Sequence, residues 1–147
     1  MTTATEPDVA DDCQFCAIAR GQAPAHLVLK TEHVVAFLDV RPVFPGHVLV
    51  VPRRHLQSLE DLPDNLLIPL YGAVREITGA VRSGLGAGGA FVATNNRVSQ
   101  SVAHLHVHVV PRTKGDGLRG FFWPRHRYPS DAEAADYAAR IAAALPD

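Results

Sequence analysis

Short apolar stretches, several of which alternate apolar with polar residues, are distributed along this chain between clusters of turn residues. Alternation with a period of two is typical of half-buried strands. The pattern predicts strands at 28–29, 33–38, 47–51, 89–94 and 102–110. The Pro- and Gly-rich residues 41–46 predict a loop between the second and third strands.

A different period marks the predicted helices. Apolar residues recur at spacings of three and four within 64–83, which predicts an amphipathic helix, at Leu67, Leu70, Val74, Ile77 and Val81. Pro69 is tolerated there only near the first turn. Residues 13–20 predict a short helical turn, and Ser130 and Glu133 have capping-box spacing before an Ala-rich helix that reaches about Leu145.

These elements predict one α+β domain, an antiparallel meander sheet with a long central helix and a C-terminal helix. We expect a flexible N-terminal tail at 1–12, a core at 13–112, and a C-terminal loop and helix at 113–147. The 147 residues are 47% hydrophobic, which is enough for a core, and the net charge of −1 gives no reason to expect a nucleic-acid partner. No apolar run suits a membrane span, and no leader resembles a secretory signal, so the expectation is a cytoplasmic protein.

Three histidines carry the strongest chemical signal. His104, His106 and His108 alternate with Leu105, Val107 and Val109, so a strand would place the imidazoles on one face and the apolar side chains on the other. Imidazole is a nucleophile and a proton carrier near neutral pH. Same-face neighbours on a strand lie roughly 7 Å apart, which disfavours a metal site made from these three residues alone.

The only two cysteines are Cys13 and Cys16. In a reducing compartment such a pair binds metal or is redox-active more often than it forms a structural bridge. A small buried pair without chemistry is the alternative.

Residues 104–110 match the signature His-φ-His-φ-His-φ-φ, where φ is hydrophobic, at every position. The chain therefore resembles the histidine-triad (HIT) superfamily of nucleotide-binding hydrolases. Residues 100–102 precede the triad as in that family, and residues 36–39 and 45–52 resemble its nucleoside-binding strands. The Cys-x-x-Cys head resembles many bacterial members, and the resemblance covers roughly 13–112.

The resemblance implies that His106 attacks the α-phosphate of a nucleotide conjugate. A nucleotidyl-phosphohistidine would form, and water would release the nucleoside monophosphate. His108 would lie beside the phosphate, with Ser101 reaching it or the bridging atom and His47 joining from the neighbouring strand. The alternatives are that Ser101 satisfies a strand-edge backbone group and that His47 is an ordinary half-exposed strand histidine.

The resemblance also implies a nucleotide-binding set: Phe37, Leu38, Asp39, Asn96, Gln100, Ser101, His106 and His108. Asp39 would bind the ribose hydroxyls, although a carboxylate there can merely cap the following loop. Phe37 and Leu38 would lie near the base, with Phe37 alternatively a core residue. The turn at 95–99 is shorter than in typical members and lacks their glycines, and residues 113–130 do not match the common branches.

Zinc-carrying relatives, including the galactose-1-phosphate uridylyltransferase branch, imply a structural zinc site formed by Cys13, Cys16, His55 and His104. A closed four-ligand shell leaves no place for a reactive water. No organic cofactor is expected.

The sequence thus predicts a nucleotidyl hydrolase or transferase that cleaves nucleoside 5′-phosphoramidates or dinucleoside polyphosphates and releases a purine nucleoside monophosphate such as AMP. The alternative is a nucleotide-binding regulatory or partner-binding protein with slow incidental turnover. By resemblance the protein is a homodimer.

Overall fold

The computed structural model describes residues 10–119 and 125–146. It divides into two units, Met1–Asp116 and Gly117–Asp147. Most of the predicted flexible tail, and residues 121–124 of the segment that departs from the family pattern, lie outside the described residues. The predicted boundary after residue 112 stays a prediction.

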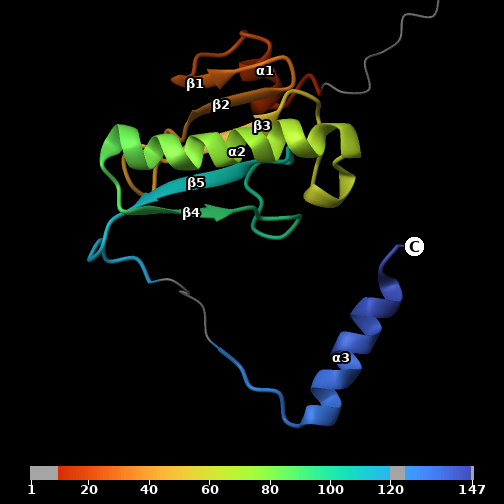
Figure 1. Ribbon diagram of the computed structural model, residues 1–147. Coiled ribbons are helices and arrows are strands. Elements are labelled where there is room, and N and C mark those ends of the chain that lie inside the picture. The colour runs from red at the N-terminus through yellow and green to blue at the C-terminus, as the bar shows by residue number, and fades with distance from the viewer. Residues whose placement is uncertain (1–9, 120–124, 147) are drawn as a thin grey trace, which may run out of the picture. The chain divides into compact units, whose positions relative to one another are not determined.

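The first unit contains a five-stranded sheet (Figure 1). Its strands are β1 (Leu27–Lys30), β2 (Val34–Leu38), β3 (Val48–Pro52), β4 (Gly89–Ala93) and β5 (Val107–Arg112). The order is β1-β2-β3-β5-β4, and every neighbouring pair is antiparallel. The predicted α+β class is confirmed. β5 lies between β3 and β4, so the histidine strand is central and β4 lies at one edge.

The histidine strand begins later than the sequence predicts. β5 starts at Val107, whereas the alternating pattern begins at residue 102. The ladder between β3 and β5 stops at the pair Val50–Val107, and β4 ends at Ala93, opposite His108, so neither ladder extends to residues 102–106. The backbone N–H of Leu105 instead donates to the carbonyl of Leu56, at 2.6 Å. His104 and His106 therefore stand just outside the sheet, and His108 stands within it.

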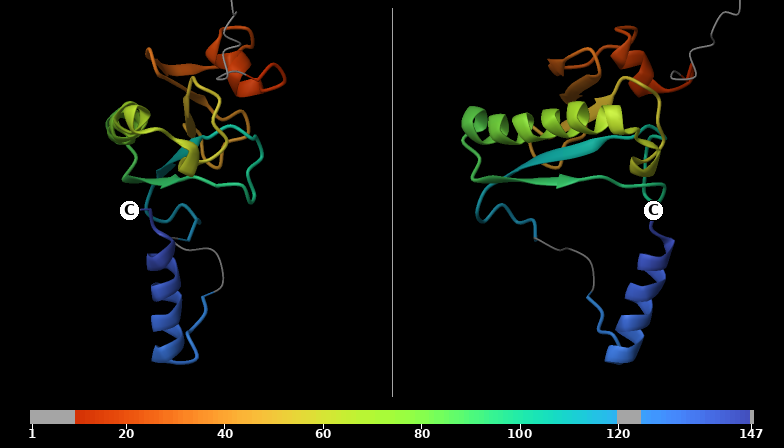
Figure 2. Two further views of the ribbon diagram at one scale, coloured as in Figure 1. Left: turned by 90° about the vertical axis from the view of Figure 1, so that its right-hand side faces the viewer. Right: turned by 45° about the vertical axis from the view of Figure 1, so that its right-hand side comes forward.

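Helix α2 (Asp64–Leu85) lies across one face of the sheet (Figures 1 and 2). It buries one apolar stripe, Leu66, Leu70, Ala73, Val74, Ile77 and Val81. This stripe packs against Val34, Ala36, Val48, Val50, Leu105, Val107 and Val109 to form the main core. The helix ends at Gly86, whose φ of 69° is the left-handed conformation that glycine adopts at low cost.

The opposite face of the sheet carries a second apolar cluster. Helix α1 (Gln14–Ala19) contributes Phe15, Cys16 and Ala19 to it. The sheet contributes Val35, Phe37, Leu49 and Val51. Alternation along the strands thus separates two faces, and the imidazoles of His104 and His106 contact the ring of Phe15 on the α1 side.

The remaining elements are short or belong to the second unit. A 3-10 helix, η1 (Leu59–Asp61), precedes α2. In the second unit, α3 (Asp131–Ala144) begins with the predicted cap, since the Ser130 side chain accepts a hydrogen bond from the Glu133 backbone at 3.2 Å. Among the helices of the described residues, none has the length and apolarity that crossing a bilayer requires.

We expect Leu70→Ala to lower the free energy of unfolding by about 2–5 kcal/mol, because it removes a fully buried side chain and leaves a cavity between α2 and the sheet. Urea denaturation measures this change. Glu76→Ala on the same helix is the control, since Glu76 is exposed, and its effect should stay within about 0.5 kcal/mol. Equal losses in the two variants would contradict the packing described above.

Candidate active site and metal centre

The buried ring of His106 is fixed by a backbone carbonyl. Its Nδ1 lies 2.7 Å from the carbonyl oxygen of His104. A carbonyl can only accept, so Nδ1 carries the hydrogen and Nε2 keeps its lone pair. This is the tautomer that an imidazole nucleophile needs if Nε2 attacks.

His106 lines a cleft of about 290 Å³ on the α1 side of the sheet. Six predicted site residues line this cleft: Phe37, Leu38, Asp39, Ser101, His106 and His108. They come from the end of β2, the loop before β5, and β5 itself. The structure therefore brings the predicted base, ribose and phosphate contacts into one cavity with the predicted nucleophile.

His47 and His108 form a hydrogen-bonded pair behind the cleft. The backbone N–H of Val43 donates to Nδ1 of His47 at 3.1 Å, so Nε2 of His47 carries the hydrogen. That hydrogen points to Nδ1 of His108, 2.9 Å away. The chain of donors leaves Nε2 of His108 as an N–H group. His47 is buried, which excludes the half-exposed alternative.

Both rings of this pair are held neutral. Burial, with smaller contributions from the neighbouring His106 and His47, lowers the pKa of His108 to about 4, although Asp39 opposes the shift. Burial also lowers the pKa of His47, again against Asp39, whose Oδ2 lies 3.8 Å from Nδ1 of His47. Asp39, His47 and His108 lie close enough to hold an ion. The ring nitrogens of the two histidines that face one another are, however, already used in a hydrogen bond.

The four predicted zinc ligands meet in one cluster. The ligand atoms of Cys13, Cys16, His55 and His104 all lie within 4.8 Å of one another. Sγ of Cys13 is 3.4 Å from Nδ1 of His104, and Sγ of Cys16 is 3.4 Å from Nδ1 of His55 and 3.5 Å from Nδ1 of His104. Tetrahedral zinc with ordinary Zn–S and Zn–N bonds places sulfur and nitrogen ligands about 3.5 Å apart. The donor set and its spacing therefore fit zinc.

The orientation of His104 supports the same assignment. Its Nε2 lies 2.8 Å from the carbonyl of Pro52 and so carries the hydrogen, which leaves the lone pair on Nδ1 facing the two sulfur atoms. A metal-binding histidine is commonly fixed by such a hydrogen bond on its other nitrogen. Burial lowers the pKa of His104 to about 4, which keeps the ring in the neutral form that binds metal.

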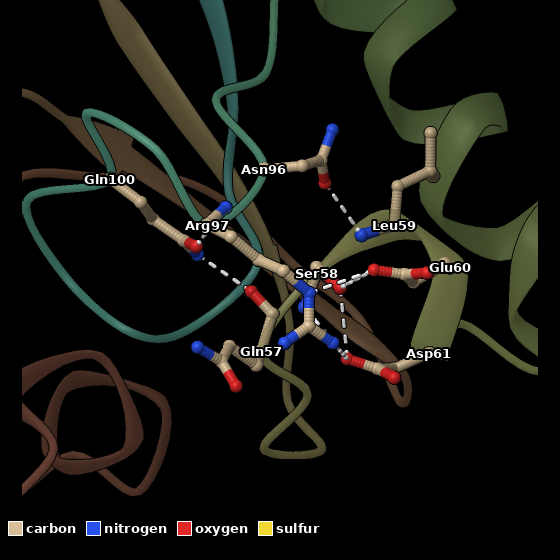
Figure 3. A network of polar contacts seen from close by, with 8 residues as sticks. All are labelled: Gln57, Ser58, Leu59, Glu60, Asp61, Asn96, Arg97 and Gln100. Atoms are coloured by element: carbon tan, nitrogen blue, oxygen red, sulfur yellow. Dashed lines mark hydrogen bonds and ion pairs between the residues drawn. The ribbon is translucent and has the colours of Figure 1, made fainter.

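Two predicted phosphate ligands lie in a different environment. Oδ1 of Asn96 accepts from the backbone N–H of Leu59 at 2.7 Å, and Nε2 of Gln100 donates to the carbonyl of Gln57 at 2.6 Å (Figure 3). Neither residue lines the cleft described above. Their contact with a nucleotide stays a prediction, and in this structure they fasten the loop before the histidines to residues 57–59.

Comparison with known proteins identifies the family. The HIT domain matches residues 20–115. The chain belongs to the HIT family. Protein hit of Bacillus subtilis is 39% identical over 120 residues, which cover 80% of this chain and 82% of that protein. A crystal structure of a HIT family member from the same organism has a TM-score of 0.83 at 35% identity and covers 93% of this chain and 99% of that one.

Two further HIT relatives carry functional names. The adenosine 5′-monophosphoramidase HNT1 of Candida albicans is 30% identical over 131 residues, which cover 85% of this chain and 82% of that protein. A zinc-bound histidine triad family protein from Mycobacterium smegmatis has a TM-score of 0.70 at 34% identity, and covers 91% of this chain and 98% of that one.

Sequence reasoning missed Phe15, which the HIT signature does not include. Its ring meets those of His106 and His104 edge-on, with centroids 5.2 and 5.9 Å away, and it lines the cleft. The available signal was an aromatic residue between the two cysteines. The amide of Val43 and the carbonyl of Pro52 were also missed, and no side-chain pattern reveals them, because both contacts are made by backbone atoms.

The neutral His47–His108 pair predicts that stability decreases in mild acid. The unfolded chain takes up a proton on His108 near the ordinary histidine pKa of about 6.5, whereas the folded chain takes it up at about 4. The unfolded state therefore binds more protons between these values, and the free energy of unfolding decreases as the pH falls from 6.5 towards 4.

Urea unfolding at pH 7 and pH 5 tests this prediction against His108→Asn, whose amide oxygen can still accept from Nε2 of His47. The variant should lose less stability between the two pH values than the parent protein. An identical loss in both proteins would show that His108 is not a source of the pH dependence.

Proposed function

We propose that the protein is a nucleotidyl hydrolase that transfers the nucleotidyl group of an adenosine 5′-phosphoramidate or a related conjugate to His106. The observation that carries this proposal is the hydrogen bond from Nδ1 of His106 to the His104 carbonyl, in a ring that lines the cleft. It leaves an unprotonated Nε2 on a rigidly held imidazole.

In the first step, Nε2 of His106 forms a bond to the α-phosphorus while the bond from phosphorus to the leaving nitrogen or oxygen breaks. The imidazole becomes cationic as the N–P bond forms, and the His104 carbonyl already accepts its Nδ1–H. Water then attacks phosphorus, the N–P bond to His106 breaks to restore the neutral ring, and the nucleoside monophosphate is released. The proton that water loses balances the proton that the leaving nitrogen or oxygen takes up in the first step. Dividing one displacement into two in this way is the advantage of a covalent intermediate.

Two further groups support the transfer. The Nε2–H of His108 is a donor for a non-bridging phosphate oxygen, where it stabilises charge that shifts during phosphoryl transfer. The hydroxyl of Ser101 lines the same cleft and is the candidate donor to the leaving group. Since His108 stays neutral, it acts as a hydrogen-bond donor and does not serve as an imidazolium acid.

The nucleoside end of the cleft is formed by Phe37, Leu38 and Asp39. Oδ1 of Asp39 accepts from the backbone N–H of Arg41 at 2.9 Å, so the carboxylate does cap the following loop. A carboxylate has about four acceptor positions, and the remaining ones suit the two ribose hydroxyls. Phe37 belongs to the second apolar cluster and also lines the cleft, so its two predicted roles are compatible.

The relative named as an adenosine 5′-monophosphoramidase supports the choice of a phosphoramidate as first substrate. Dinucleoside polyphosphates share the same α-phosphate chemistry and belong in the same substrate panel. A binding protein with incidental turnover would bind AMP through the same cleft, so turnover rates, and not affinity, distinguish it from an enzyme.

We further propose that Cys13, Cys16, His55 and His104 hold a structural zinc ion. The spacing of the ligand atoms, the orientation of His104 and the zinc-bound relative support it. Bound zinc would cross-link α1, the segment after β3 and the histidine segment, and it would contribute no reactive water. The homodimer stays a proposal as well; the exposed α2 residues Leu67, Ile68 and Tyr71 are an apolar surface available to it.

Replacing His106 with Asn should reduce turnover of adenosine 5′-phosphoramidate by at least about 10³-fold, since the nucleophile is lost. The amide nitrogen of Asn can still donate to the His104 carbonyl, so AMP binding should change little. Liquid chromatography of released AMP and calorimetric AMP titration measure the two effects. His33→Asn, at a partly exposed turn histidine, is the control and should keep full turnover, and unimpaired turnover in His106→Asn would refute the nucleophile assignment.

Metal analysis of the purified protein should find about one zinc per chain, and Cys13→Ala should lose it, because three remaining ligands bind zinc much more weakly than a closed set of four. The melting temperature of that variant should fall to that of the chelator-treated parent. The zinc proposal would be contradicted if the purified parent contained no zinc and its melting temperature did not change on addition of a chelator.

A further inference from the structure

Phe15 stands between the metal cluster and the nucleophile. It lies on α1 between the two cysteines, and its ring is buried. Ring planes meet at 81° with His106, 72° with His104 and 63° with Phe37. Edge-to-face contacts of this kind restrict the ring orientations of both partners. The position of α1 therefore bears directly on the orientation of the His106 imidazole.

His104 joins the same two sites through different atoms. Its Nδ1 faces the cysteine sulfur atoms, and its backbone carbonyl accepts the Nδ1–H of His106. A change in the position of the His104 ring would move the carbonyl that sets the tautomer of His106. The metal cluster and the nucleophile are thus separated by one residue in the chain and by one aromatic ring in space.

The sheet does not hold this segment. β5 begins at Val107, so His104 and His106 lie outside the strand ladder. Besides the hydrogen bond from Leu105 to Leu56, the segment is attached through the Pro52 contact of His104 and through the cluster. Leu105 is anchored in the main core, whereas the rings of His104 and His106 lie on the other face, where the cross-link formed by the four ligands would hold them.

We propose that Phe15 and the His104 carbonyl transmit the order of the metal cluster to His106, which makes Phe15 a positioning residue of the active site. This inference rests on the proposed function. When a metal ion holds the four ligands together, the Phe15 ring and the His104 carbonyl keep His106 oriented with Nε2 facing the cleft. With the ligands free, α1 and residues 102–106 gain freedom, and His106 samples the other tautomer and other ring angles.

The cluster is also accessible for metal exchange. A second pocket of about 360 Å³ is lined by Cys13 and His55, together with Ala10, Asp12, Ser101 and Ala103. Cys16 and His104 lie deeper and are almost fully buried. His55 is half-buried, so a chelator can approach the cluster from this pocket, and we expect metal removal without unfolding.

The first experiment compares zinc-loaded protein with protein treated with a chelator and a thiol reductant, followed by reloading with zinc chloride. Nitrogen-15 NMR of labelled histidine reports the tautomer of His106 independently of activity. We expect one Nδ1–H tautomer with an exchange-protected proton in the loaded protein, a mixture in the metal-free protein, and recovery on reloading. An unchanged spectrum, or a protein that binds no zinc, would overturn the inference.

The second experiment uses Phe15→Leu, which retains apolar volume but removes the ring edges, in zinc-loaded protein. Formation of the adenylylated intermediate should slow by about tenfold or more, since small misplacements of a reacting group are costly, while the affinity for AMP changes less than twofold. Val35→Ala, in the same apolar cluster on β2, controls for lost packing and should keep the parent rate. If Phe15→Leu lowered the rate of adenylylation and the affinity for AMP by the same factor, Phe15 would be a substrate contact, and its positioning role would be overturned.

Failure of this inference is distinguishable from failure of the proposed function. If the parent protein adenylylates His106 at the same rate in its zinc-loaded and metal-free forms, the coupling is refuted, and the proposed hydrolase function is unaffected. If the loaded parent never forms the intermediate, the proposed function is refuted, and the NMR comparison still decides whether the cluster orders His106.

Discussion

The hydrogen bond between Nδ1 of His106 and the carbonyl of His104 is the interaction on which the chemistry of this site depends. A neutral imidazole has two tautomers, and only one of them leaves the lone pair on Nε2. The two groups belong to residues two apart in one chain, so the bond needs no partner element to form. It does need residues 104–106 to keep one backbone conformation, and this requirement explains why so much of the surrounding structure contacts that segment.

The other histidines follow the same logic. The Pro52 carbonyl determines the tautomer of His104. The Val43 amide determines the tautomer of His47, whose Nε2–H in turn determines that of His108. A buried polar atom without a partner is costly, and within the described residues no buried side-chain nitrogen or oxygen lacks one. Each of these hydrogen bonds defines which ring nitrogen carries the hydrogen, which lets the four imidazoles lie close together.

The sequence predicted the parts of this arrangement that depend on periodicity. Alternation placed Leu105, Val107 and Val109 in the core under α2, and the three-four spacing located α2 itself. The grouping of Cys13, Cys16, His55 and His104 was also predicted, although only by resemblance, because the two histidines are distant from the cysteines in the chain. Because successive side chains of a strand point to opposite faces, the main core and the histidine rings lie on opposite sides of one sheet.

The sequence did not predict where the strand pairing stops or which backbone groups contact the histidines. The late start of β5 depends on its pairing with β3 and β4, which is a property of several segments together. The carbonyl of Pro52 and the amide of Val43 belong to residues whose side chains give no hint of these contacts. Phe15 had a side-chain signal, but its importance lies in ring contacts that appear only when α1 is placed against residues 104–106.

The loop before the histidines contains two residues in a strained backbone conformation. Arg97 and Ser99 have left-handed φ values of 69° and 57°, which cost free energy for residues with a side chain. The strain is offset by local bonds: the Arg97 backbone N–H donates to Oε1 of Gln100 at 2.9 Å, and the Arg97 guanidinium contacts Glu60 at 2.7 Å (Figure 3). Side-chain contacts with 57–61 thus replace strand pairing in this loop, which lies between the end of β4 and the start of β5.

This replacement has a functional consequence. The segment 52–61 contacts the loop and the histidine segment through backbone groups of Pro52, Leu56, Gln57 and Leu59, and it also carries His55. One irregular segment therefore positions the metal cluster, the His104 ring and the loop that leads to Ser101. A sheet ladder would fix these groups through backbone bonds alone. Here the loop is held by the side chains of Asn96, Arg97 and Gln100, so we expect the order of the site to depend on residues that do not line the cleft.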